Sequence, residues 1–196
     1  MAWPNRGLAH RSVAVGARGV VASAHPAATQ AGLQMLRQGG NEIDAIVATA
    51  AALNVAEPYM SGIGGVGYLL SYQASERTLR VLNYNGTAPR AAHPDAFRNR
   101  LEQEHGPKSP MIPAAAGGWL TALETLGRLD RAAVFAPAID LAETGIPLTP
   151  RGEYFYRNSL NGGHLDSPTK AVFFPDGSVP PAGTVIRQPK LARTFR

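Results

Sequence analysis

Apolar side chains recur at helical spacing in a stretch near the N-terminus that opens with His25-Pro26. Proline suits the first position of a helix, and Gly39-Gly40 closes the stretch as a left-handed cap would. The apolar positions follow the spacing i, i+3, i+4, i+7 and i+8, and they are Ala28, Ala31, Gly32, Met35 and Leu36. The pattern predicts an amphipathic helix, with His25 as its cap rather than as a general base.

A second helix is predicted directly after the first. Almost every side chain from Ala45 to Val55 is apolar and many are alanine, which is typical of a helix that is buried on several sides. Asn41 is a good N-cap, and Asp44 lies three residues further on, close to a capping box. The pattern stops at Glu57. Asp44 and Glu57 are therefore roughly 20 Å apart at 1.5 Å per residue, too far for a catalytic pair of carboxylates.

The remaining segments mix strands and helices. Residues 18–24 are predicted to form a short buried strand, and residues 68–73 and 78–84 an antiparallel hairpin with a short turn. Further helices are predicted over residues 94–104, from Gly117-Gly118-Trp119 to Gly127, and over 130–143, whereas the chain from Ser159 onward is expected to be rich in loops. This order predicts an α+β fold with an antiparallel component rather than βαβ units.

Composition narrows the class of protein. Apolar residues make up 44% and charged residues 17% of the 196 residues, which indicates a globular chain. The net charge of +5 is spread without basic runs, so no nucleic-acid partner is expected. There is no cysteine, and the five histidines lack metal-binding spacing, so neither a metal site nor another cofactor is expected.

Two further observations concern whether the protein associates with a membrane and in which compartment it is found. Residues 1–12 lack the apolar core of a signal peptide, and the apolar stretch 45–56 is too short to span a bilayer. The sequence therefore predicts no membrane association. It leaves the compartment open, with the cytoplasm favoured.

A glycine-rich loop, Gly62-Ile63-Gly64-Gly65-Val66-Gly67, matches the G-x-G-x-x-G pattern of dinucleotide-binding proteins. In those proteins a strand precedes the loop and a helix follows it, so that the pyrophosphate meets the helix N-terminus. Here a predicted helix precedes the loop and a predicted strand follows it. We therefore interpret the glycines as structural, allowing the backbone to pass close to the alanine-rich helix.

Four blocks, in order, resemble the γ-glutamyltranspeptidase (glutathione hydrolase) family. They are residues 19–72, the hairpin ending in Asn83-Tyr84-Asn85-Gly86-Thr87-Ala88-Pro89, the stretch from Ile112-Pro113 through residues 135–150, and Gln188-Pro189-Lys190-Leu191. The resemblance covers about residues 17–196. It implies that this span is the N-terminal part of the family's large subunit, incomplete at its C-terminal end, and that residues 1–16 are an N-terminal extension.

The resemblance implies a partial αββα N-terminal-nucleophile hydrolase fold. Family members are made as one precursor that cuts itself into a large and a small subunit, and the new N-terminal threonine attacks the γ-glutamyl amide of glutathione-type substrates. The expected partners are a small γ-glutamyl substrate and a small subunit or downstream half carrying that threonine. Thr49, Thr87 and Thr121 match no processing motif. No catalytic residue is therefore expected here, and residues 1–196 alone are expected to be inactive.

One substrate-binding position of the family falls within the chain. Typical members carry an arginine that pairs with the substrate's α-carboxylate, and the matching residue here is Asn85, which offers an amide and no charge. The difference favours a related acylase, of glutaryl or cephalosporin type, as an alternative to a γ-glutamyl enzyme. An inactive truncated fragment is a second alternative. Asn85 can also be a plain turn residue, because Asn-Gly is a strong turn signal.

Overall fold

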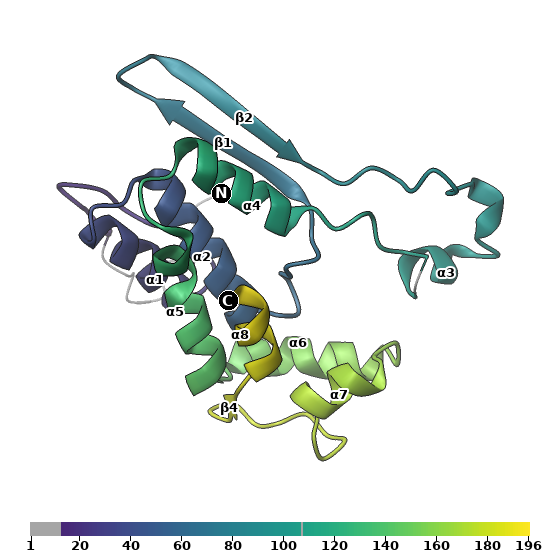
Figure 1. Ribbon diagram of the computed structural model, residues 1–196. Coiled ribbons are helices and arrows are strands. Elements are labelled where there is room, and N and C mark those ends of the chain that lie inside the picture. The colour runs from purple at the N-terminus through teal and green to yellow at the C-terminus, as the bar shows by residue number, and fades with distance from the viewer. Residues whose placement is uncertain (1–12, 107) are drawn as a thin grey trace, which may run out of the picture.

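The computed structural model describes residues 13–106 and 108–196, so most of the expected extension 1–16 lies outside the described part. The elements follow one another along the chain as Figure 1 shows. They are α1 (Pro26–Arg37), α2 (Glu42–Ala56), β1 (Gly67–Gln73), β2 (Thr78–Tyr84), the 3-10 helix η1 (Pro94–Ala96), α3 (Arg100–Glu104), α4 (Ala115–Leu126), α5 (Arg131–Thr144), β3 (Ile146–Pro147), α6 (Pro150–Asn161), α7 (Ser167–Phe173), β4 (Val185–Ile186) and α8 (Pro189–Phe195). The mixed fold with antiparallel strand pairs is confirmed.

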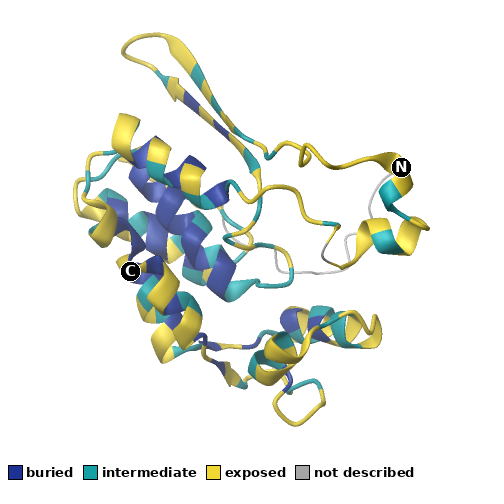
Figure 2. Cartoon of the chain, turned by 45° about the vertical axis from the view of Figure 1, so that its right-hand side comes forward, coloured by how far each residue is buried: buried dark blue, intermediate teal, exposed yellow. Residues whose placement is uncertain are grey.

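Helix α2 lies at the centre of the larger of two hydrophobic cores. It packs against α1, α4 and α5, and Figure 2 shows it dark blue among partly exposed neighbours. The small side chains of α2 and α1 allow close approach, since a Cβ added to Gly32 would lie 2.3 Å from Thr49 Oγ1. The prediction of a helix buried on several sides is confirmed, with one large apolar side chain, Ile46, left 45% exposed.

A buried carboxylate ties the start of α2 to the loop between α4 and α5. Asp44 is 0% exposed and accepts hydrogen bonds from the backbone N–H groups of Asn41 (2.8 Å), Arg128 (3.1 Å) and Leu129 (3.3 Å). The Asn41 amide in turn donates to the Leu126 carbonyl at 2.6 Å. The predicted capping box is confirmed, and it also binds a segment more than eighty residues away along the chain.

The predicted hairpin is confirmed, and its two faces differ. Strands β1 and β2 pair antiparallel with Leu69 opposite Leu82 and Leu70 opposite Val81. Leu69 and Ser71 face the helices and are buried, whereas the alternate positions, including Tyr68 and Leu70, are exposed. The hairpin extends beyond the helices that support it (Figure 1).

A second, smaller core lies below the first, around α6, α7 and the β3–β4 pair (Figure 1). Its buried residues are Leu148, Tyr156, Phe174 and Ile186. The expectation of a loop-rich chain from Ser159 onward is confirmed for residues 162–166 and 174–184, but two helices that it left out, α7 and α8, also form there. Both are short helices that begin with proline at the first turn, and Phe195 of α8 is held by stacking on Phe135 of α5. Tertiary packing stabilises helices too short to be evident from their periodicity.

Two other predictions need correction. The expected strand 18–24 is absent, because no described segment pairs with it, and Val20 remains 65% exposed. The expected helix 94–104 is divided into η1 and α3, since Asn99 caps α3 with its side chain and interrupts the helix. The helices predicted near residues 117–127 and 130–143 are confirmed as α4 and α5. None of the described helices is long and apolar enough to cross a membrane.

Replacing Asp44 with asparagine is expected to destabilise the fold by about 3 kcal/mol, because an amide nitrogen would face backbone donors that then lack a partner. Urea unfolding followed by circular dichroism measures the loss. Asp176→Asn is the matched control, since Asp176 is exposed in a turn. Equal stability losses for the two variants would contradict the role assigned to Asp44.

Candidate substrate-binding end of the hairpin

The candidate site is the open end of the hairpin, where β1 begins at Gly67 and β2 ends at Tyr84. Asn85 is exposed at this end. Its backbone N–H donates to Asn83 Oδ1 (2.9 Å), and its side-chain amide donates to the Tyr68 hydroxyl (3.2 Å). The side chain predicted from the sequence as substrate-binding is therefore oriented by a residue of the neighbouring strand.

The pair formed by Asn85 and Tyr68 is neutral. The hydrogen bonds among the described residues use one amide N–H of Asn85 and leave its Oδ1 and the phenol hydrogen of Tyr68 for an outside group. Such a set can both donate to and accept from a ligand. A carboxylate bound here would receive hydrogen bonds without the charge assistance that an arginine supplies.

The glycine loop joins this end of the hairpin to α4. The Gly65 carbonyl accepts hydrogen bonds from the backbone N–H groups of Ala114 (3.1 Å) and Ala115 (2.9 Å). Gly86 lies against the Ile112 carbonyl, where an added Cβ would come within 2.2 Å of the oxygen. The loop is followed by the strand β1 rather than by a helix, so this glycine pattern does not form a dinucleotide-binding turn.

The structural interpretation of the glycines is only partly right. A Cβ added to Gly62 or Gly64 would meet nothing within 4 Å, so these glycines do not let the backbone pass close to α2. The contact between α2 and the start of the loop is made instead by Ser61, whose hydroxyl accepts a hydrogen bond from the side-chain amide of Asn54 (2.5 Å). What the loop does provide is the Gly65 carbonyl that holds the start of α4.

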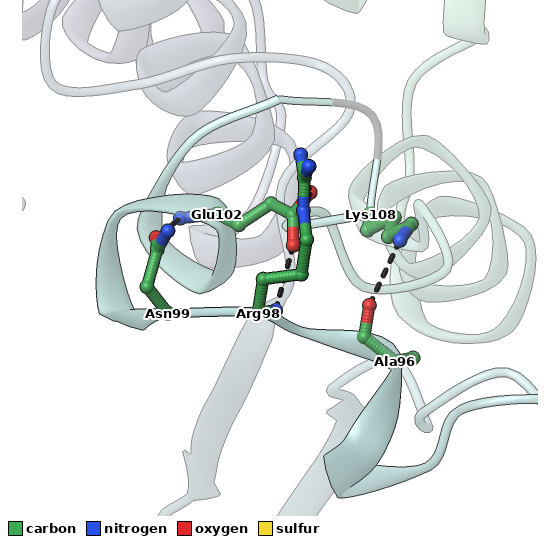
Figure 3. A network of polar contacts seen from close by, with 5 residues as sticks. All are labelled: Ala96, Arg98, Asn99, Glu102 and Lys108. Carbon is green, nitrogen blue, oxygen red and sulfur yellow. Dashed lines mark hydrogen bonds and ion pairs between the residues drawn. The ribbon is translucent and has the colours of Figure 1, made fainter.

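An excursion, residues 85–114, leaves the site and returns to it (Figure 1). Figure 3 shows the polar contacts at its far end. The Arg98 guanidinium and backbone N–H both donate to the Glu102 carboxylate, at 2.8 Å each, and Lys108 Nζ donates to the Ala96 carbonyl at 2.8 Å. The hydrogen bonds from Arg98 lower the pKa of Glu102 to about 2. Side-chain contacts rather than apolar burial therefore organise this end of the excursion.

Other residues considered for catalysis have structural roles. His25 Nδ1 accepts from the Ala27 N–H (3.2 Å), as expected of a cap. The Thr49 hydroxyl is buried in α2 and donates to the Ala45 carbonyl (2.7 Å). Within residues 13–106 and 108–196, no three His, Cys, Asp or Glu side chains are grouped to hold a metal ion.

Sequence reasoning missed Tyr68. The strand alternation could have placed it on the exposed face, but its contact with Asn85 depends on the pairing register, in which Tyr68 lies opposite Asn83. Register is set by the turn between the strands and by which face is buried. A single sequence specifies it weakly in a hairpin whose outer face is also apolar.

Solved structures define the class of protein. Helicobacter pylori γ-glutamyltranspeptidase superimposes with a TM-score of 0.87 and 27% identity, over 94% of this chain and 54% of that one. Cephalosporin acylase from Bacillus halodurans superimposes with a TM-score of 0.85 and 33% identity, over 100% of this chain and 38% of that one. The fold is a partial αββα fold of the N-terminal-nucleophile hydrolase class, as expected.

Sequence comparison then identifies the family. A family model described as Gamma-glutamyltranspeptidase matches residues 28–196, and the chain belongs to that family. The glutathione hydrolase proenzyme of Bacillus subtilis (strain 168) is 34% identical over 95% of this chain. The Acylase ACY 1 proenzyme of Pseudomonas sp. (strain V22) is 42% identical over 70% of it. The chain spans 33% and 26% of the lengths of these two relatives.

The contact between Arg98 and Glu102 is expected to persist in acid. The pKa of the Glu102 carboxyl is lowered from its ordinary value of 4.5 to about 2. The stabilising contact between Arg98 and the ionised Glu102 is therefore fully present above pH 4.5 and is lost as the pH falls through about 2. An NMR titration of the side-chain carboxyl carbon measures the midpoint. Arg98→Gln should return it toward 4.5, whereas Arg100→Gln should not, since Arg100 pairs with Glu104. A wild-type midpoint near 4.5 would contradict the contact.

Proposed function

We propose that residues 17–196 are the N-terminal part of the large subunit of an amide hydrolase that transfers γ-glutamyl groups from glutathione-type substrates. Two findings support this. The chain belongs to the γ-glutamyltranspeptidase family, and it spans about a third of relatives that are named proenzymes. Residues 1–16 are an extension to this segment. The partner is a small subunit or downstream half of the same polypeptide.

The proposed reaction places the nucleophile in that downstream half. Its N-terminal threonine hydroxyl attacks the amide carbonyl, and its α-amino group takes the proton. The C–N bond breaks, the amine leaves with a proton, and an ester-linked acyl-enzyme remains. Water or an amino acid then attacks the ester and releases the acyl group. In this scheme the present chain contributes substrate binding rather than chemistry.

The observation that carries the substrate proposal is the open end of the hairpin. Asn85 occupies the position where the family resemblance implies a contact with the α-carboxylate, and Tyr68 orients its amide. We assign substrate binding to Asn85. Its side chain is neutral, so it holds a carboxylate less strongly than an arginine would, by about 1.5–3 kcal/mol, the typical contribution of a charged hydrogen bond.

A related acylase is the second candidate, and the same residue favours it. Glutaryl amides lack the α-carboxylate, so they lose nothing when the cation is absent. Two relatives support this candidate, because one is named an acylase and the other a cephalosporin acylase. An inactive fragment is the remaining alternative, and the activity of the complete polypeptide separates it from the other two.

Residues 1–196 alone are expected to release no aniline from γ-glutamyl or glutaryl anilides, since the proposed threonine and its oxyanion donors belong to the downstream half. The assay is absorbance of the released aniline against a matched blank. The complete polypeptide, assayed in parallel, is the positive control. Turnover by pure 1–196 above the blank would contradict the proposal that the downstream half carries the catalytic groups.

Asn85→Arg in the complete polypeptide is expected to raise kcat/KM for γ-glutamyl substrates roughly tenfold or more, because a charge-assisted pair replaces a neutral contact. Glutaryl analogues should gain nothing. Steady-state kinetics with both substrates measure the difference. Asn161→Arg, at the end of α6, controls for the added charge.

Two results would refute the assignment of Asn85. The two substrates could respond equally to the arginine, or the wild type could already prefer the γ-glutamyl compound strongly. In either case Asn85 is a turn residue, and another cation binds the carboxylate.

A further inference from the structure

The outer face of the hairpin changes character at its open end. Along most of the two strands this face carries large, exposed apolar or aromatic side chains, namely Leu70, Tyr72, Leu79 and Val81. At the open end the exposed side chains are polar and uncharged instead: Tyr68, Asn83 and Asn85. A few convergent polar groups beside an apolar surface are suited to bind the polar end of a ligand.

Hydrogen bonds join these three polar side chains. The backbone N–H of Asn85 donates to Asn83 Oδ1 (2.9 Å), and the side-chain amide of Asn85 donates to the Tyr68 hydroxyl (3.2 Å). Asn83 lies opposite Tyr68 in the register of the hairpin. Asn83 therefore holds the backbone of Asn85 while Tyr68 holds its amide, so the direction of the amide is set before a ligand binds.

The Tyr68 hydroxyl remains able to donate a hydrogen bond. It accepts from Asn85 and so keeps its own hydrogen, while the Asn85 amide keeps a second N–H and its Oδ1. Within the described ranges, none of these three groups has a hydrogen-bond partner. The two donor atoms are 3.2 Å apart, close enough for the two oxygens of one carboxylate to accept one hydrogen bond from each.

We propose that Tyr68 and Asn85 together form a neutral clamp for the α-carboxyl end of a γ-glutamyl substrate, in which Tyr68 is a second substrate-binding residue. The neutral clamp takes a free α-carboxylate through its two donors. It also takes an α-carboxamide, whose oxygen accepts from Tyr68 and whose N–H donates to Asn85 Oδ1. This inference rests on the proposed function, and it widens the class of substrates to γ-glutamyl donors that are amidated at the α-carboxyl.

A cation is the alternative to the neutral clamp, and two arginines lie within five residues of Asn85 along the chain. Arg80 pairs with Glu76, which belongs to the turn at the opposite end of the hairpin. Arg90 is exposed in the excursion. Among the hydrogen bonds of the described residues, the side chain of Asn85 contacts Tyr68 and neither arginine. The observed contact therefore favours Tyr68, and Arg90 is the rival to be tested.

Steady-state kinetics of the complete polypeptide with three anilides test the neutral clamp. They are γ-glutamyl anilide, its α-amide, and γ-aminobutyryl anilide, which lacks the α-carboxyl group. Tyr68→Phe is expected to raise KM for the first two roughly two- to tenfold, the loss of one neutral hydrogen bond, with kcat nearly unchanged. KM for the third should not change. Tyr72→Phe is the matched control, because Tyr72 is a similarly exposed tyrosine on the same face of β1.

Two further measurements separate a binding role of Tyr68 from a merely supporting one. In an Asn85→Ala background, Tyr68→Phe should still raise KM, because the phenol itself donates to the substrate; a residue that only orients Asn85 would have no further effect. In the wild type, kcat/KM for the α-amide should lie within roughly tenfold of that for the free acid, since no charge-assisted pair favours the acid.

Three results would overturn the inference. They are equal effects of Tyr68→Phe and Tyr72→Phe, no effect of Tyr68→Phe in the Asn85→Ala background, and a preference for the free acid beyond the tenfold range. Arg90→Gln then shows whether Arg90 is the cation, because it would raise KM for the acid and not for the α-amide.

The proposed function fails separately from the neutral clamp. Calorimetry measures binding of L-glutamate and of its α-amide to the complete polypeptide. If no acyl transfer occurs but Tyr68→Phe weakens both ligands, the function is refuted and the neutral clamp is supported. If acyl transfer occurs and Tyr68→Phe behaves as Tyr72→Phe does, the neutral clamp is refuted and the function stands. Neither turnover nor binding refutes both.

Discussion

The carboxylate of Asp44 holds together segments that are distant in the chain, and the larger core is organised around it. It accepts backbone hydrogen bonds at the start of α2 and from the loop between α4 and α5 while fully buried. A buried carboxylate is tolerable only when its lone pairs are satisfied, so these donors must stay in place. That requirement fixes α2 relative to α4 and α5, and α4 in turn packs against β2 of the hairpin.

The two faces of the hairpin have different surroundings, because successive side chains along each strand point to opposite faces. The inner side chains, Leu69 and Ser71, meet the helices, while the open end presents Asn85 and Tyr68 outward. The Gly65 carbonyl fastens the base of the hairpin to α4, so the candidate site is attached to the core by backbone contacts. The excursion that begins at Asn85 is organised mainly by polar contacts such as that between Arg98 and Glu102, shown in Figure 3.

In the described part of the chain, β1 has one free edge, and the buried hydroxyl of Ser71 on the same strand has no hydrogen-bond partner. Exposed strand edges are normally covered or blunted, because they pair readily with other chains. The outer face of the hairpin carries exposed apolar side chains such as Leu70 and Val81, and Figure 2 shows most of the hairpin in yellow, the colour of exposed residues.

Local signals in the sequence determined α1, α2, α4, α5 and the hairpin. Asn41 and Asp44 form the predicted cap, His25 caps α1, and the alternating runs pair as predicted, because each depends on neighbours a few residues away. Only the tertiary structure decided that Asp44 also binds Arg128 and Leu129, that Tyr68 meets Asn85, and that α8 packs on α5. The strand expected at residues 18–24 shows the reason most clearly. A strand exists only with a partner, and pairing between distant segments is set by the whole fold rather than by the residues of either one.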